Sequence, residues 1–479
     1  MATQKLKKNL ETNIKIIKDE FNDDLLKRRD IVNINNQDVK ISLLYFGLLA
    51  NRDFIQTSIV KPVLDYLSDF PQSELIEFIE KSLIISSEVK ASSDIKEVTD
   101  ELMFGKTILF VEGYDQCLII ETNDRVTRTP NEPDAEATLR GPREGFTESL
   151  MTNISLLRRK ILNPDLKFHY LKVGKETNVY LSYTYIDSLV DTRALHEFED
   201  RLNKINLDAV LDTNTITEAI SNRGISPFEI IGQTERPDTL ASKLLEGKIG
   251  VMMDGSPVAL TLPFLFVENF QTNEDYYINS FFVSFARIVR ILGFIISTLL
   301  PGVYVAVISF HWEIVPTRMA LSIAQAQEGL SLPTSIEAFI MLIAFEITRE
   351  TGIRTPSGLG QSMSIVGTLV IGQAAIQARL ASPFMVIVVA LTAITGLINY
   401  KLKGATIFIR FILLLAGSIM GLFGVFIVGF LVVFHIASIN SFGVQYMERG
   451  FPMKKGNLKD SILRVKGEGV SKLDDNKEQ

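Results

Sequence analysis

The sequence has few of the residues that build metal centres and disulfide scaffolds. Its 479 residues include one cysteine, Cys117, which excludes a disulfide framework and a cysteine-rich zinc or iron–sulfur site. The four histidines lie far apart, and none has the paired spacing of a zinc ligand set. No Ser/His/Asp or Cys/His combination can be assembled for nucleophilic catalysis. We therefore expect a protein that is not an enzyme and that holds no metal and no cofactor.

Acidic residues are missing from one long stretch of the chain. None occurs between Glu350 and Glu448, a run of 97 residues. A soluble fold of that size would need acidic residues at its surface for solvation. The net charge of -7 is an average over two parts, because residues 1–285 carry 32 basic and 45 acidic residues whereas residues 286–479 carry 17 and 11. This contrast excludes a wholly soluble protein.

The N-terminal half predicts a soluble domain. The first residues are charged and lack the apolar run of a cleaved signal peptide, so a cytoplasmic N-terminal domain is expected. Residues 1–38 predict a charged, mobile arm or a surface helix. Residues 39–280 mix strand and helix patterns without strict alternation, which predicts an α+β (α/β-mixed) fold of two subdomains that meet near residues 170–178. Hairpins are predicted at 107–122 and 249–262.

Residues 281–447 predict an all-α polytopic membrane domain. Four apolar stretches are long enough to span a bilayer core of about 30 Å, at about 289–310, 361–378, 382–400 and 411–436. The charged tail, residues 448–479, is predicted to be disordered.

A further apolar stretch, between Glu337 and Glu346, has only eight residues, or about 12 Å of helix. It predicts a short re-entrant or interfacial helix. Four spans place Lys401, Lys403 and Arg410 outside, against the positive-inside tendency, and a fifth span would correct these charges but export the tail.

Two features of the membrane region stand out as structural signals. Pro301 and Gly302 lie at the centre of the first span, where they predict a helix break, with a simple proline kink as the alternative. Charged residues flank the short apolar stretch, and we expect the acidic and basic residues among them to pair with each other. They predict a membrane-proximal charge network of Glu337, Glu346, Arg349, Glu350 and Arg354.

The uncharged segment 361–377 predicts a pore wall. At helical steps of three and four, one face has polar ends and an apolar middle, in which Val366 and Val370 would form a hydrophobic constriction. The alternative is that its glutamines bond to neighbouring helices and its valines are ordinary packing. The candidate pore-lining residues are Ser362, Val366, Leu369, Val370, Gln373 and Gln377.

Whole strings of the sequence carry a family resemblance. They include FHWEIVPTRMALSIAQAQEGLSLPTSIEAF (310–339), FEITRETGIRTPSGLGQSMSIVGTLVIGQAAIQARLASPFMVIVVALTAI (345–394) and TERPD (234–238). These strings resemble the A subunit of the spore germinant receptor (GerA-type) of endospore-forming Firmicutes. The resemblance covers nearly all of the chain from about residue 40, whereas residues 1–38 carry no family signal.

The resemblance implies a membrane protein of the spore inner membrane, with its N-terminal domain on the spore-core side. It implies a B subunit, which is transporter-like and binds the nutrient, and a lipoprotein C subunit as partners. It also implies a homo-oligomeric ring, for example a pentamer, around a ligand-gated channel for monovalent cations that triggers germination. The alternatives are a non-conducting signal-relay or scaffold subunit of the same complex, and the related A-like protein linked to dipicolinate release. No nucleic-acid partner is expected.

Overall fold

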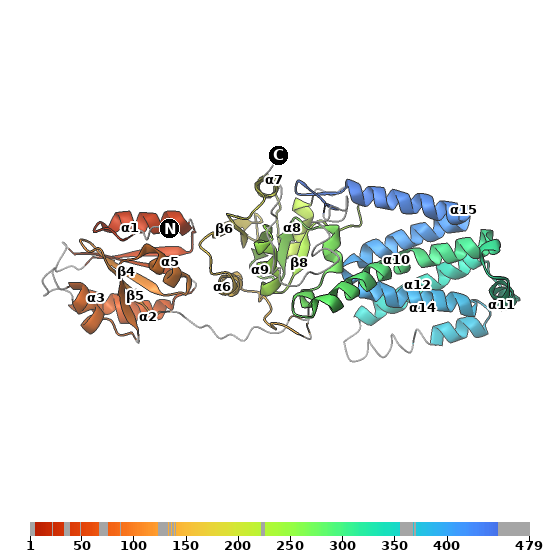
Figure 1. Cartoon of the computed structure of the whole chain (residues 1–479), viewed down its shortest axis with the longest axis horizontal. Coiled ribbons are helices and arrows are strands. Elements are labelled where there is room, and N and C mark those ends of the chain that lie inside the picture. The colour runs from red at the N-terminus through yellow and green to blue at the C-terminus, as the bar shows by residue number, and fades with distance from the viewer. Residues whose placement is uncertain are drawn as a thin grey trace. The chain divides into compact units, whose positions relative to one another are not determined.

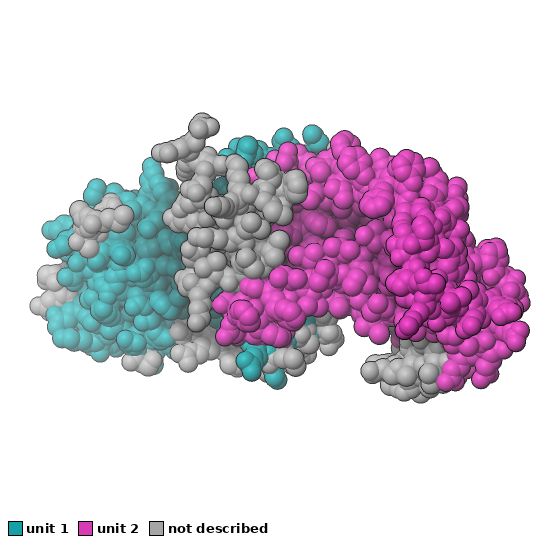
Figure 2. Space-filling view, turned by 45° about the vertical axis from the view of Figure 1, so that its right-hand side comes forward, with its two compact units in different colours: residues 1–222, 231–263, 468–479 teal, residues 223–230, 264–467 magenta. Residues whose placement is uncertain are grey.

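The computed structural model describes residues 5–21, 23–32, 39–47, 49–66, 75–86, 88–122, 133, 136, 138, 140–221, 226–354, 367 and 370–448. The chain divides into two compact units, whose elements are labelled in Figure 1 and whose surfaces are coloured in Figure 2. Unit 1 comprises residues 1–222, 231–263 and 468–479, and unit 2 comprises residues 223–230 and 264–467.

The first sheet of unit 1 is antiparallel, with the strand order β1-β2-β4-β5-β3. Its β4 and β5 pair from Thr107↔Ile120 to Phe110↔Cys117, which confirms the hairpin predicted at 107–122. Alternate side chains of the central strands enter two different hydrophobic clusters, so both faces of the sheet are covered by helices. The strands are Leu26–Val32 (β1), Lys40–Phe46 (β2), Val89–Ser92 (β3), Thr107–Val111 (β4) and Cys117–Ile120 (β5). The helices are Leu10–Phe21 (α1), Arg52–Phe54 (α2), Ile55–Val60 (η1), Lys61–Tyr66 (α3), Leu75–Phe78 (α4), Ile79–Leu83 (η4) and Ile95–Met103 (α5).

The N-terminal residues are part of this core: a helix is present within 1–38, at Leu10–Phe21, but it packs into the unit and is not a mobile arm. The apolar residues of α1 recur every three to four positions, and Leu10, Ile14 and Phe21 are buried. This spacing forms one apolar stripe that packs inward while the charged residues stay outside. Strand β1 then pairs along its whole length with β2.

The second sheet of unit 1 has the order β6-β7-β9-β10-β8. The hairpin predicted at 249–262 is confirmed by the pairing of β9 with β10. Residues 170–178 lie inside the β6–β7 hairpin, so the predicted subdomain boundary is wrong, and the chain passes between the sheets after Ile120 and before Leu166. The strands are Leu166–Val173 (β6), Val179–Ile186 (β7), Gly232–Thr234 (β8), Ile249–Met253 (β9) and Ala259–Leu262 (β10), and the helices are Leu150–Lys160 (α6), Thr192–Asn203 (α7), Thr213–Ile220 (α8) and Pro237–Leu245 (α9).

Unit 2 is a helical bundle. Short 3-10 helices precede it at Phe266–Phe270 (η5) and Asn273–Tyr276 (η6), and a small hairpin of Asn440–Ser441 (β11) and Val444–Gln445 (β12) follows it. The bundle consists of Ser280–Phe310 (α10), Trp312–Ile314 (η7), Thr317–Gln327 (α11), Thr334–Arg354 (α12), a helix at 370–377, Pro383–Ile398 (α14), Tyr400–Leu402 (η8) and Lys403–Ser438 (α15).

Two stretches of the described chain are long and apolar enough to cross a membrane by length and composition, Ser280–Phe310 and Tyr400–Ser438. A third apolar helix, Pro383–Ile398, is shorter. Of the predicted span 361–378, residues 367 and 370–378 are described, and the other eight lie outside the described residues.

The short helix predicted between Glu337 and Glu346 is longer than expected. Helix α12 has 21 residues and continues through both carboxylates. Its length of about 32 Å matches the apolar thickness of a bilayer. The prediction failed because it ended the helix at each acid, whereas Glu337 bonds to Ser382 and Glu346 pairs with Arg410 inside the bundle.

Helix α15 turns back on itself at Gly421, which has non-helical dihedral angles (φ 62°, ψ -148°). The predicted span 411–436 is therefore split between two halves, 403–420 and 422–438. A methyl group on Gly424 would clash with the carbonyl oxygen of Ala416, so the halves touch along their glycines. Each half is about 26 Å long.

The helices of unit 2 alternate in direction. We call the end of the bundle at Ser280–Arg290 proximal and the end at Phe310 distal. The first half of α15 runs parallel to α10, because Asn399, just before it, bonds to the Arg290 carbonyl and Gly421 packs against Phe310. Its second half returns, since the hairpin β11–β12 that follows bonds to the segment before α10.

The other helices fit the same alternation. Helix α12 begins beside Ser382, in the cluster that holds Val305 of distal α10, and α14 begins there too. Both therefore run back toward the proximal end. The helix at 370–377 runs outward between them, because Gly367 faces Thr348 of α12 and Ala375 packs with Ala338.

Candidate functional site

The helix at 370–377 presents most of its surface outward from unit 2. Val370, Gln373 and Gln377 are exposed, and Ala375 is the residue that packs into the bundle. Neither glutamine has a hydrogen-bond partner among the described residues. Three of the six candidate pore-lining residues thus share a helix surface that the unit itself leaves uncovered; the other three, Ser362, Val366 and Leu369, lie outside the described residues.

The distal end of this helix is set by local backbone bonds. Arg379 has a positive φ of 55°, and the N–H groups of Leu380 and Ala381 both bond to the Ala375 carbonyl. This left-handed residue ends the helix and leads directly into Ser382, whose side chain caps α14. The candidate pore helix and α14 are therefore joined by a tight, fully bonded turn.

Pro301 and Gly302 do not interrupt α10, which runs unbroken from Ser280 to Phe310. Instead, Gly302 allows close approach of α15: a methyl group there would lie 2.8 Å from the Leu413 carbonyl oxygen. Gly417 faces it, since a methyl group at Gly417 would lie 2.5 Å from the Gly302 carbonyl oxygen. The two residues therefore form a backbone contact between helices rather than a break.

The predicted charge network divides into separate groups. Glu346 pairs with Arg349, and Glu350 pairs with Arg354 at 2.7 Å, each within α12. Glu346 also accepts a hydrogen bond from Arg410 of α15 at 3.1 Å.

Arg410 is 2% exposed and donates a second bond to the Ser297 carbonyl of α10 at 2.7 Å. One buried guanidinium therefore ties α15 to both α12 and α10. Local sequence patterns place Arg410 only among the charges outside the membrane, because its partner Glu346 lies 64 residues earlier in the chain.

Glu337 stands apart from these pairs. It is 1% exposed, and its Oε1 accepts hydrogen bonds from the Ser382 N–H at 2.5 Å and the Ser382 hydroxyl at 2.8 Å. It therefore joins the start of α12 to the start of α14.

A second ionic group holds the entry to the bundle. Asp275 of η6 is buried and contacts Arg287 at 2.9 Å and Arg290 at 3.0 Å, both on the first turns of α10. Arg290 also donates to the Phe270 carbonyl. Asp275 was not predicted from the sequence, although two acids, Glu274 and Asp275, stand beside aromatic residues there, and Asp275 lies twelve positions before the first of two arginines.

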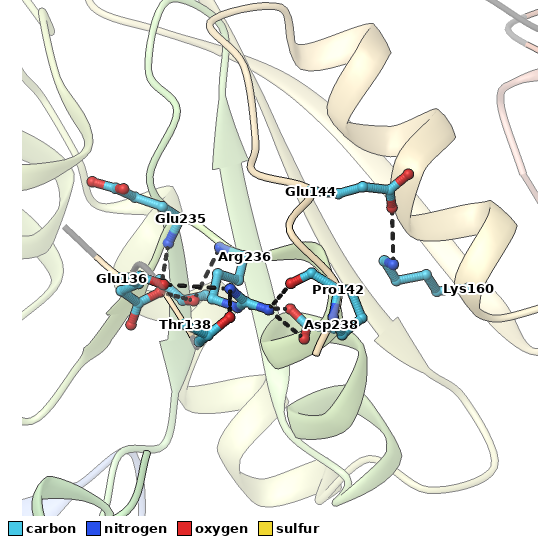
Figure 3. A network of polar contacts seen from close by, with 9 residues as sticks. Glu136, Thr138, Pro142, Glu144, Lys160, Glu235, Arg236 and Asp238 are labelled. Atoms are coloured by element: carbon cyan, nitrogen blue, oxygen red, sulfur yellow. Dashed lines mark hydrogen bonds and ion pairs between the residues drawn. The ribbon is translucent and has the colours of Figure 1, made fainter. Parts of the chain in front are cut away.

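In unit 1 the TERPD string forms a buried polar network (Figure 3). Arg236 is fully buried and bonds to Asp238 through two nitrogens, at 3.0 and 2.9 Å. The same guanidinium donates to the Pro142 carbonyl at 2.5 Å and the Thr138 hydroxyl at 3.1 Å. It thereby fastens Glu136, Thr138 and Pro142 to the start of α9, which is a structural role.

A second buried arginine joins the two sheets of unit 1. Arg158 of α6 pairs with Asp23 and lies 4.4 Å from the ring centre of Phe46 and 5.0 Å from that of Phe168. Burial raises the pKa of Asp23 and lowers the pKa of Arg158, in each case against the effect of the partner's charge. Such a pair is costly to break because either charge alone would stay buried.

The described residues show no cluster of three or more His, Cys, Asp or Glu side chains that could hold a metal ion. Burial raises the pKa of the Cys117 thiol, which lies inside the first sheet.

Comparison with known proteins gives consistent matches. The family described as "Bacillus/Clostridium GerA spore germination protein" matches residues 8–473. Spore germination protein KA of Bacillus subtilis (strain 168) is 39% identical over 454 residues, which cover 92% of this chain and 83% of that protein. The membrane protein YfkQ of the same organism is 36% identical over 425 residues, 88% of this chain and 82% of that protein.

A solved structure is also similar. It is the crystal structure of the N-terminal domain of the A subunit of the Bacillus megaterium spore germinant receptor GerK3, with 25% sequence identity and a TM-score of 0.45. The similarity covers 56% of this chain and 99% of that chain.

Proposed function

The chain belongs to the Bacillus/Clostridium GerA family of spore germination proteins, and from this premise we propose that it is the A subunit of a nutrient germinant receptor. Its copies assemble into a ring in the spore inner membrane, together with a transporter-like B subunit that binds the nutrient and a lipoprotein C subunit. The ring encloses a channel for monovalent cations that opens when nutrient binds.

The uncovered helix surface at 370–377 carries this proposal. Uncharged amides are expensive in lipid unless they meet protein or water. Gln373 and Gln377 meet neither within their own unit, yet they lie on a helix that packs along α12 and α14. Neighbouring copies around a water-filled pore would solvate both amides and place Val370 at a narrow point.

The alternating helix directions support a membrane topology of six passes. In this arrangement α12 and the two halves of α15 each cross, so the loop at Lys401 and Lys403 lies at the proximal end with the N-terminal domain. The conflict with the positive-inside tendency then disappears, because these lysines join Arg287 and Arg290 on one side. The C-terminal hairpin also returns to that side.

Cysteine labelling tests this topology. In a Cys117→Ser background, a membrane-impermeant maleimide should reach Lys403→Cys only from the side of the N-terminus. It should reach Met319→Cys, on the exposed surface of distal α11, only from the opposite side. Labelling of both positions from one side would support the four-span order instead.

Ion flux tests the channel. Full-length protein in liposomes should conduct K⁺, and Val370→Ala should raise the basal flux by widening the constriction. Spores that carry Val370→Ala should release cations without nutrient. Ile394→Ala is the matched control, since Ile394 is an equally branched residue, 62% exposed on α14 and away from the candidate pore helix.

A non-conducting relay subunit is the competing function. In that case liposomes that contain the natural protein or Val370→Ala would show no K⁺ flux. Spores that lack the protein would still fail to germinate. An unaltered flux in Val370→Ala and in a bulky Val370→Phe variant would show that this face lines no pore.

A further inference from the structure

A buried carboxylate oxygen near the distal end of the bundle has no partner. Glu337 Oε1 is fully used by the two hydrogen bonds from Ser382, whereas Oε2 is buried without a hydrogen bond. The described residues place no lysine, arginine or histidine in an ion pair with this side chain. A buried carboxylate without a counter-charge is strongly destabilising, so something must compensate it.

A second buried oxygen atom without a hydrogen bond lies near Glu337. The hydroxyl of Tyr304 on α10 is buried without a hydrogen bond. It lies beside the Ser382 hydroxyl and near the Glu337 carboxylate, and its ring packs in the cluster that holds Ala338 and Ala381. Three helices, α10, α12 and α14, thus each supply one oxygen-bearing side chain to one buried point.

We propose that Glu337, Tyr304 and Ser382 form a binding site for a monovalent metal cation such as Na⁺ or K⁺. Glu337 Oε2 and the Tyr304 hydroxyl oxygen are the free ligands, and the Ser382 hydroxyl completes the protein side. Oxygen atoms are the ligands that alkali cations take.

The charge of the site selects the class of ion. One carboxylate balances one positive charge, whereas Ca²⁺ and Mg²⁺ sites use more carboxylates. The two hydrogen bonds from Ser382 and the positive end of α14 favour the ionised carboxylate, whereas burial favours the protonated one, so a cation competes with a proton at Oε2.

The site differs from the candidate pore in its residues and its consequence. It bridges the start of α12 to the turn that ends the helix at 370–377, so a bound cation would stiffen that junction. It does not require the chain to conduct ions: a relay subunit would bind the same cation.

Cation-dependent stability tests the proposal on the full-length protein in lipid nanodiscs. At constant ionic strength and pH, replacing N-methyl-D-glucamine chloride with NaCl or KCl should raise the Tm by about 2–5 °C and saturate. Glu337→Gln keeps an acceptor for Ser382 but removes the charge, and it should abolish the rise. Tyr304→Phe should raise the half-saturating concentration about fivefold.

Glu313→Gln is the matched control, since it removes an exposed carboxylate in η7 near the distal end and should keep the full response. A natural protein whose Tm is the same in all three salts would overturn the proposal, and this measurement needs no variant to fold. So would a response that survives in Glu337→Gln. A Tm that ignores the cation but changes with pH in a Glu337-dependent manner would show that the carboxyl binds a proton instead.

Discussion

Unit 1 and unit 2 of this chain place their apolar residues in opposite ways. Unit 1 buries aliphatic strands such as Thr107–Val111 and leaves ion pairs such as Lys81–Glu77 at its surface. Unit 2 exposes large apolar side chains, including Phe426 and Phe430 at 75% and 70%, although both units bury arginines, Arg236 in unit 1 and Arg410 in unit 2. This contrast is compatible with a membrane protein in which unit 2 meets lipid and unit 1 meets water.

The helix contacts of unit 2 agree with this interpretation. In lipid, apolar side chains gain nothing by moving inward, so helices associate through close packing and polar bonds. Gly302 against Gly417, and Arg410 between Glu346 and the Ser297 carbonyl, are contacts of these two kinds. Unit 1 instead gains its stability from the two aliphatic clusters on the faces of its first sheet.

A matched pair of lysine substitutions gives the largest expected difference between the units. Phe430→Lys places a charge at the middle of the second half of α15 and should cost about 2.5–3.5 kcal/mol of membrane insertion. Leu211→Lys, at a residue of unit 1 that is 80% exposed, should change stability by less than about 0.5 kcal/mol. The measurement is the fraction of each variant recovered folded from the membrane fraction by size-exclusion chromatography.

The result bears directly on what surrounds α15. Equal recovery of the two variants would mean that Phe430 faces water, and the comparison between the units would then fail. Phe430→Leu is the control for size, because it keeps the apolar character of the position and should be recovered like the natural protein.

Much of unit 1 was predictable because its strands are short apolar runs bounded by turn residues. Thr107–Val111 and Ile249–Met253 appear in the structure at the predicted residues. The mispredictions came from tertiary context. The helix Leu10–Phe21 was expected at the surface because its composition is charged. Its apolar residues nevertheless form one stripe, and this stripe is buried in the core. The boundary near 170–178 fell inside a hairpin whose pairing a local pattern cannot show.

Unit 2 was harder to predict, because hydropathy indicates how long an apolar helix is but not which residues of other helices it contacts. The apolar stretch predicted from the sequence stops at Glu337 and at Glu346, since an isolated acid is unfavourable in lipid. The partners that make both acids tolerable, Ser382 and Arg410, lie 45 and 64 residues further along. Likewise, the turn at Gly421 looks like any other small-residue position until its positive φ is seen.

The smallest expected effect comes from adding one methyl group at each of two glycines of α15. Gly417→Ala would place its methyl 2.5 Å from the Gly302 carbonyl oxygen, so α10 and α15 must separate, at a cost of about 1–3 kcal/mol. Gly429→Ala meets nothing within 4 Å, and the higher helix propensity of alanine should stabilise by up to about 1 kcal/mol. Thermal unfolding in detergent should therefore show a lower Tm for the first variant and an unchanged or higher Tm for the second. If both variants changed the Tm alike, the close contact between Gly302 and Gly417 would not be what holds unit 2 together, and the difference between the two units would rest on their surfaces alone.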